Sequence, residues 1–108
     1  MFSLSMKLSA AALVLALPLN AWAQSAYPGR TVRILVGFPP GQATDVVARA
    51  IAQKLTETMG QQFIVDNRPG AAGIIGSEQA AKAAPDGYTL LMSSSGPLAV
   101  NPGLYSKL

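Results

Sequence analysis

The sequence has 108 residues, half of them hydrophobic, with eight basic and five acidic side chains and a net charge of +3. This length allows one small domain at most, and a weak positive charge without a basic run argues against nucleic acid as a partner. Histidine and cysteine are both absent, which excludes disulfides, His-based catalysis and most transition-metal sites within the chain, so we expect no metal and no cofactor.

Residues 1–23 have the three parts of a secretory signal peptide. Lys7 supplies the positive charge, residues 8–19 are mostly apolar, and residues 21–23 (Ala-Trp-Ala) form a small-x-small cleavage site. The apolar stretch is shorter than the roughly 20 residues that a membrane-spanning helix needs, which disfavours an uncleaved anchor. The sequence therefore predicts a signal-peptide helix, export to the periplasm, and a mature chain that starts at Gln24.

The mature chain opens with a predicted strand and helix. Residues 31–37 are β-branched and apolar, which is typical of a strand buried on both faces. In residues 46–59, apolar side chains recur every four positions, which predicts a helix with one apolar stripe. Gly60 is expected to end this helix in the left-handed conformation. The stripe consists of Val47, Ile51, Leu55 and Met59, with Ala50 beside it.

The second half of the chain repeats this alternation. The expected elements are a strand over 62–66, a helix over 74–84, a strand over 88–92 and the start of a further helix within 98–108. Strands that alternate with helices in this way form right-handed crossovers and a parallel sheet. The sequence therefore predicts the α/β class.

The loops that follow the three strands are the candidate binding segments, because ligands of open parallel sheets bind at the carboxyl ends of the strands. They are residues 38–45, 67–73 and 93–96. The first loop enters a helix, where the amides of Ala43, Thr44 and Asp45 would lack partners and would point at an anionic oxygen, such as that of a carboxylate. Gly41 has no side chain, so a ligand could approach the main chain there.

Each of these features also has an ordinary explanation. Thr44 and Asp45 are residue types that favour the cap and first turn of a helix, and serines 93–95 are common turn residues. The glycines within 70–76 lack the spacing of a dinucleotide-binding motif and follow the wrong strand. Close packing of a helix on the sheet explains these small residues better. The residues concerned are Gly73, Gly76, Ala80 and Ala84.

The sequence offers no catalytic constellation. No serine lies in a G-x-S-x-G elbow, and the chain has no base that could activate one. Asp86 lies in a Pro-Asp-Gly turn, which accounts for it. We therefore expect a binding protein and not an enzyme.

Several segments occur in an order and with gaps that resemble one known family. They are residues 34–41, 65–73 and 84–92, together with Asn101-Pro102. The chain resembles the Bug (TctC-like) family of substrate-binding proteins of tripartite tricarboxylate transporters. This resemblance implies a type II periplasmic-binding-protein fold with two α/β domains around a cleft. It also implies a small carboxylate ligand and membrane permease subunits as partners, and we expect a monomer.

The resemblance implies that the loops after the first and third strands hold the ligand. The expected ligand-binding residues are Phe38, Pro40, Gly41, Gln42, Thr44, Asp45, Ser93, Ser94 and Ser95. The family usually has Pro-Gly-Gly where this chain has Pro-Gly-Gln at 40–42. If the second glycine needs a positive φ, Gln42 would be strained or the loop reshaped; alternatively, its side chain could hydrogen-bond the ligand.

The chain is short for this family. Residues 24–108 would form the first part of an α/β solute-binding domain, and the second domain would be absent. The alternative is a truncated fragment that binds nothing, because three strands and two helices would leave one face of the sheet poorly covered.

Overall fold

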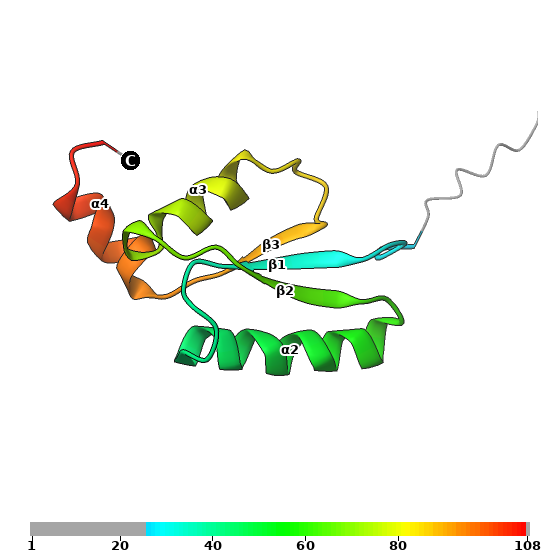
Figure 1. Ribbon diagram of the computed structural model, residues 1–108. Coiled ribbons are helices and arrows are strands. Elements are labelled where there is room, and N and C mark those ends of the chain that lie inside the picture. Colours follow the sequence, from blue (N-terminus) through cyan, green and yellow to red (C-terminus); the bar gives the residue numbers. More distant parts are fainter. Residues whose placement is uncertain (1–25, 108) are drawn as a thin grey trace, which may run out of the picture.

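A computed structural model describes residues 26–107, which form a three-stranded parallel sheet between helices (Figure 1). The strands are β1 (Val32–Val36), β2 (Phe63–Asn67) and β3 (Thr89–Met92), in the order β2-β1-β3. Both neighbours pair with β1 in parallel, so the predicted α/β class and parallel sheet are confirmed. The expected signal peptide, residues 1–23, lies outside the described residues.

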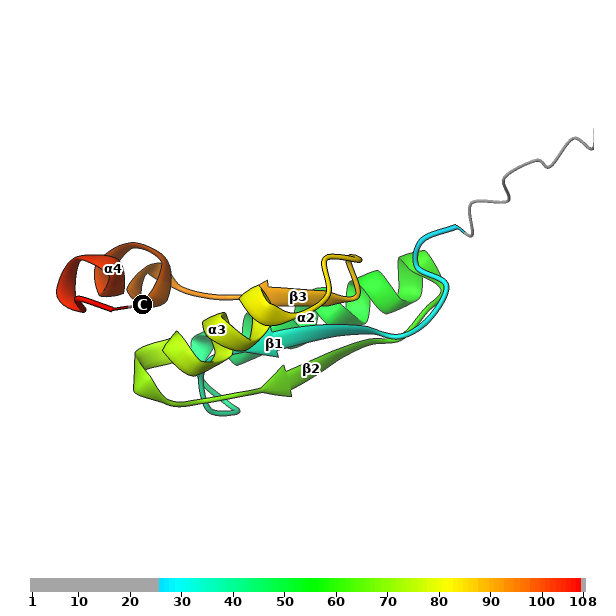
Figure 2. The same cartoon turned by 90° about the horizontal axis from the view of Figure 1, so that it is seen from above.

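The two long connections place one helix on each face of the sheet. Helix α2 (Ala43–Met59) connects β1 to β2, and α3 (Ile74–Lys82) connects β2 to β3. Because the chain steps outward to β2 and then back across β1 to β3, right-handed crossovers put the helices on opposite faces. Figure 1 shows this directly, and Figure 2, seen from above, looks onto the α3 side. None of the helices in the described part of the chain is long and apolar enough to cross a membrane.

Strand β1 forms the centre of the core. Its Val32, Ile34 and Val36 pack with small residues of α2 and with Phe63 of β2. Leu35 is fully buried as well and points to the opposite face. The prediction of a strand buried on both faces is therefore confirmed. The two outer strands are less well covered: Ile64 of β2 is 46% exposed, and all four residues of β3 are partly exposed.

The predicted apolar stripe of α2 is wrong. Val47, Ile51 and Met59 are 51%, 40% and 39% exposed, and Ala50 is exposed as well. The buried face carries Ala48 and Ala52, with Leu55, a member of the predicted stripe, partly buried beside them. The sheet itself supplies the large side chains at this interface, so the helix contributes alanines and lies close to the strands.

This correction predicts a large loss of stability at one position and almost none at its neighbour. Ala48→Leu should lower the free energy of unfolding by about 1–3 kcal/mol, because the added carbons have no room against β1. Val47→Ser should change it by less than about 0.5 kcal/mol, because Val47 is half exposed. Urea unfolding of the two variants measures both values. The reverse order of effects would restore the predicted stripe.

The boundaries of the helices differ from the predicted ones by a few residues. Helix α2 begins at Ala43, three residues earlier than expected, and Gly60 ends it with φ 73° and an amide hydrogen bond to the Thr56 carbonyl, as predicted. Helix α3 ends at Lys82, so Ala84, expected to help it pack, lies beyond it and is exposed.

The chain after β3 is helical, as expected, but from an earlier residue. A wide π-type turn, η2 (Gly96–Val100), leads into the short α4 (Asn101–Leu104). The Asn101 side chain is buried and donates a hydrogen bond to the Ala72 carbonyl at 3.1 Å. This bond ties the segment after β3 to the 3₁₀ turn η1 (Ala71–Gly73) that precedes α3.

Residues 27–30 contact the chain just before β3, at the amino end of this strand. The Tyr27 hydroxyl donates to the Gly87 carbonyl at 2.6 Å, and the Gly29 amide donates to the Tyr88 hydroxyl at 2.8 Å. The Arg30 guanidinium lies 3.9 Å from the centre of the Tyr88 ring. These contacts lie before the start of β3, so they leave the carboxyl ends of the strands free.

Candidate functional site

The carboxyl ends of the three strands meet at one edge of the sheet, on the left in Figure 1. From β1 the chain leads to β2 on one side of it and then crosses back to β3 on its other side. The gap between the carboxyl ends of β1 and β3 is therefore a topological switch point. The loops after β1 and β3 border this gap. These are the two loops in which the ligand-binding residues were predicted.

Gly73 is the point at which these loops come together. A Cβ atom placed on Gly73 would collide with the Pro97 ring of η2 and would lie 3.1 Å from Cζ of Phe38. The loop after β1 and the segment after β3 therefore pack against the same glycine. Phe38 is half-buried in this contact. Of the predicted serines, Ser93 and Ser94 are half-buried and Ser95 is exposed at the start of η2.

The first turn of α2 provides free hydrogen-bond donors at this edge. Gln42 is the N-cap residue, and its carbonyl accepts the Val46 amide at 3.0 Å. Within residues 26–107, the amides of Ala43, Thr44 and Asp45 form no hydrogen bond. Together with the positive end of the helix dipole, these three amides form an amide cradle that favours an anion.

The loop before the cradle has the left-handed residue at Gly41. Its φ is +90°, and a Cβ atom there would meet nothing within 4 Å. Gln42 instead has an ordinary extended backbone, with φ −76° and ψ 165°, so the strain considered for this position does not arise. The Gln42 side chain forms no cap hydrogen bond and is exposed, as is Pro40. The tip of the loop is therefore open to solvent.

The carboxylate of Asp45 is turned into the protein. The residue is only 2% exposed, and its carboxylate accepts hydrogen bonds from the Gly41 amide at 3.0 Å, from Arg49 Nε at 3.0 Å and from Asn67 Nδ2 at 2.9 Å. The Arg49 hydrogen bond, followed by those of Gly41 and Asn67, lowers the pKa of Asp45 from 3.8 to about 2. Asp45 is therefore charged at neutral pH, and Arg49 compensates its charge.

Arg49 was not predicted as a site residue, and Asn67 lies in the candidate loop 67–73 but was not among the predicted ligand-binding residues. The spacing of Asp45 and Arg49 is i, i+4, which is a visible signal for a helical ion pair. No local signal marks Asn67, because it reaches Asp45 only through the parallel register that pairs it with Val36.

The bonds of Asp45 predict a specific loss of stability in acid. A carboxyl group whose pKa is lowered by folding stabilises the fold above its unfolded pKa of about 3.9, and this contribution disappears as the pH falls through the folded value. The wild type should therefore be more stable than Asp45→Asn at neutral pH, and the difference should vanish between about pH 4 and pH 2. Urea midpoints measured across this range test it. A difference that grows on acidification would refute this role of Asp45.

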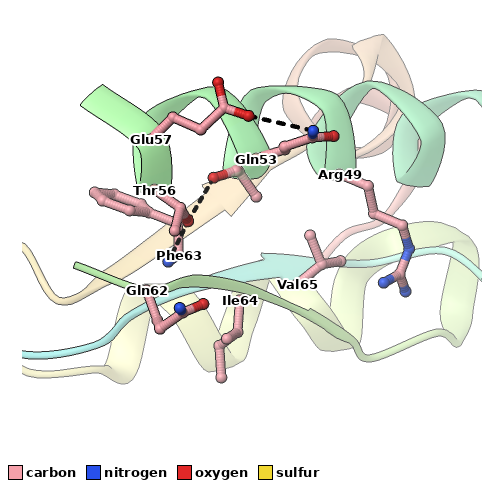
Figure 3. A pocket seen from close by; sticks show the side chains of 9 residues that line it. Arg49, Gln53, Thr56, Glu57, Gln62, Phe63, Ile64 and Val65 are labelled. Atoms are coloured by element: carbon pink, nitrogen blue, oxygen red, sulfur yellow. Dashed lines mark hydrogen bonds between the residues drawn. The ribbon is translucent and has the colours of Figure 1, made fainter. Parts of the chain in front are cut away.

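A separate hollow of about 490 Å³ lies between α2 and the free edge of β2 (Figure 3). Thr56 Oγ1 accepts the Phe63 amide at 2.9 Å there, and Gln53 hydrogen-bonds Glu57. Of the lining residues, only Arg49 also takes part in the Asp45 cluster. The hollow lies along the helix, away from the amide cradle, and includes none of the predicted ligand-binding residues.

Known proteins resemble this chain in both sequence and structure. The family model for tripartite tricarboxylate transporter family receptors matches residues 47–108, more than half of the chain. BugT of Bordetella pertussis is 53% identical over 79 residues, which cover 72% of this chain and 24% of BugT. The chain spans about a quarter of the length of such curated relatives.

Two of the similar solved structures contain a carboxylate. MatC of Rhodopseudomonas palustris, with bound malate, is 39% identical with a TM-score of 0.72, covering 76% of this chain and 28% of MatC. Another R. palustris protein, solved with adipate, is 43% identical with a TM-score of 0.64, covering 65% and 23% of the two chains. Another similar structure, described as a periplasmic transporter, is 43% identical with a TM-score of 0.74 and covers 77% and 28%.

Proposed function

Because the chain belongs to the tripartite tricarboxylate transporter receptor family, we propose that it is the periplasmic component that binds a small carboxylate for such a transporter. The observation that carries this proposal is the amide cradle at the start of α2, whose donors form no hydrogen bond within residues 26–107 and whose first residue, Ala43, is exposed. The malate and adipate bound to its relatives have the chemistry that such a cradle accepts.

The proposed site holds one ligand carboxylate between two loops. The amides of Ala43 and Thr44 donate to its oxygens from one side, and the hydroxyls of Ser93, Ser94 and Ser95 donate from the other. Gly41 leaves room for the ligand, and Gln42 can reach its distal polar group. The Asp45 carboxylate does not repel the ligand, because Arg49 neutralises it inside the protein.

The remaining parts of the proposal follow the family. Residues 1–23 direct export to the periplasm, and residues 24–108 form the first part of the binding domain. A second domain would close over the ligand, the receptor would act as a monomer without catalysing a reaction, and membrane permease subunits would receive the ligand. The alternative is that residues 24–108 by themselves bind no carboxylate.

Proline at position 43 tests the amide cradle without damaging the helix. Proline is favoured at the first helical position, and the extended Gln42 before it has the backbone that proline requires. Ala43→Pro should therefore keep the melting temperature of the wild type. It removes one donor to a charged ligand, so the Kd for malate or adipate should rise about tenfold.

Ala43→Ser is the matched control, because it changes the side chain and keeps the amide. It should bind malate as the wild type does in an equilibrium titration. Equal affinity of Ala43→Pro and the wild type would exclude the cradle as the site. A folded wild type that binds neither malate nor adipate would support the fragment alternative.

A further inference from the structure

We propose that Asn67, at the end of strand β2, is the residue that positions the amide cradle. Its Nδ2 donates to the Phe38 carbonyl at 3.0 Å and to Asp45 Oδ1 at 2.9 Å, and its Oδ1 accepts from Arg49 Nη2 at 3.0 Å. One side chain thus uses its donors and its acceptor to join the loop after β1 to the first turn of α2.

These bonds fix the loop at both ends. Asn67 holds the carbonyl of Phe38, and Asp45 holds the amide of Gly41. Together with Arg49, Asn67 also holds the Asp45 carboxylate, so it contributes to both anchors. Between them lie two exposed prolines, which cannot donate a backbone hydrogen bond. The position of the loop relative to the free amides therefore depends on the side chain at 67.

Asparagine is the residue type that fits these partners. An amide can donate two hydrogen bonds and accept others at the same time. Aspartate would keep the acceptor for Arg49 but lose both donors, and it would place a second carboxylate next to that of Asp45. Alanine would remove every bond. Asn67 acts through Phe38 and Asp45 and does not itself contact the ligand, so it is a positioning residue.

The first experiment needs no ligand. In the full chain carrying Asn67→Ala, the Gly41 amide should exchange its hydrogen roughly tenfold faster than in the wild type, because Asp45 loses its support. The Gly60 amide, which caps the far end of α2, should keep its rate. The matched control is Asp66→Asn, which removes the ion pairs to Arg33 and Arg68 at the same strand end. An unchanged rate at Gly41 in Asn67→Ala would overturn the proposal.

The second experiment rests on the proposed function and uses malate as the probe. At pH 7, Asn67→Asp should bind malate at least roughly tenfold more weakly than the wild type, whereas Asp66→Asn should bind it equally well. The charged groups that contact position 67 are Asp45 and Arg49, both from α2. Its chain neighbours Asp66 and Arg68 pair with each other.

The pH dependence separates positioning from a general loss of structure. When acid protonates the new carboxyl group beside Asp45, it can again donate a hydrogen bond, so the affinity ratio of Asn67→Asp to the wild type should recover at low pH. Taking the ratio cancels the ionisation of malate itself. A ratio that stays constant with pH would contradict positioning by Asn67. If the wild type binds no malate, the proposed function fails, and the exchange rate of Gly41 still decides the role of Asn67.

Discussion

Gly76→Ala is expected to lower the free energy of unfolding by about 3 kcal/mol, at the upper end of the cost of overpacking. The added Cβ would lie 2.7 Å from Gly37 Cα and 3.1 Å from the Arg68 carbonyl oxygen. Both are backbone atoms, directly after β1 and β2, so neither can turn away as a side chain could. Alanine in a helix is worth about 1 kcal/mol more than glycine, which is too little to offset this collision.

Gly103→Ala is the matched control for this helix glycine. Gly103 lies in α4, and a Cβ atom there would meet nothing within 4 Å. This substitution should leave the urea midpoint unchanged or raise it slightly. If Gly76→Ala behaved in the same way, α3 could not lie as close to β1 as the structure places it.

Gly73→Ala is expected to lower the free energy of unfolding by a similar amount and to affect the proposed binding site as well. Gly73 has φ +85°, where an alanine costs about 1–2 kcal/mol. The Cβ would also collide with Pro97 and press on the Phe38 ring, which adds roughly 1–3 kcal/mol. Relief of this collision would separate the two loops, so the affinity for malate should fall together with stability.

Gly60→Ala measures the free-energy cost of an alanine at positive φ without any collision of its Cβ. Gly60 has a similar φ of +73°, and a Cβ atom there would meet nothing within 4 Å. It should therefore cost only the conformational part, about 1–2 kcal/mol, and leave malate binding intact. Equal urea midpoints for Gly60→Ala and Gly73→Ala would mean that the loops do not meet at Gly73.

The sequence predicted those features that follow from local chemistry. The buried strand around Leu35, the left-handed cap at Gly60 and the close helix packing at Gly76 are confirmed, whereas Gly73 lies before α3 and packs against Pro97 and Phe38. Each depends on a run of apolar residues or on the absence of a side chain. The family resemblance is confirmed as well.

The features that depend on tertiary packing were not predictable in this way. The four-residue spacing of Val47 and Ile51 correctly indicated a helix but not its buried face, which is set by the size of the strand side chains opposite Ala48. Likewise, the sequence allowed Asp45 to be either a ligand contact or an ordinary first-turn residue. Its inward bonds depend on Asn67, which only the register of β2 against β1 brings near.

A titration of the ¹⁵N-labelled chain with malate, followed by the backbone amide resonances, tests the central claim most directly. The amides of Ala43 and Thr44 should shift downfield and saturate in the millimolar range, because each gains a hydrogen bond to a charged oxygen. Malamide, the neutral diamide of malate, should cause no such shift. Saturable shifts confined to residues of the hollow between α2 and β2 in Figure 3, with the Ala43 and Thr44 amides unmoved, would contradict the account.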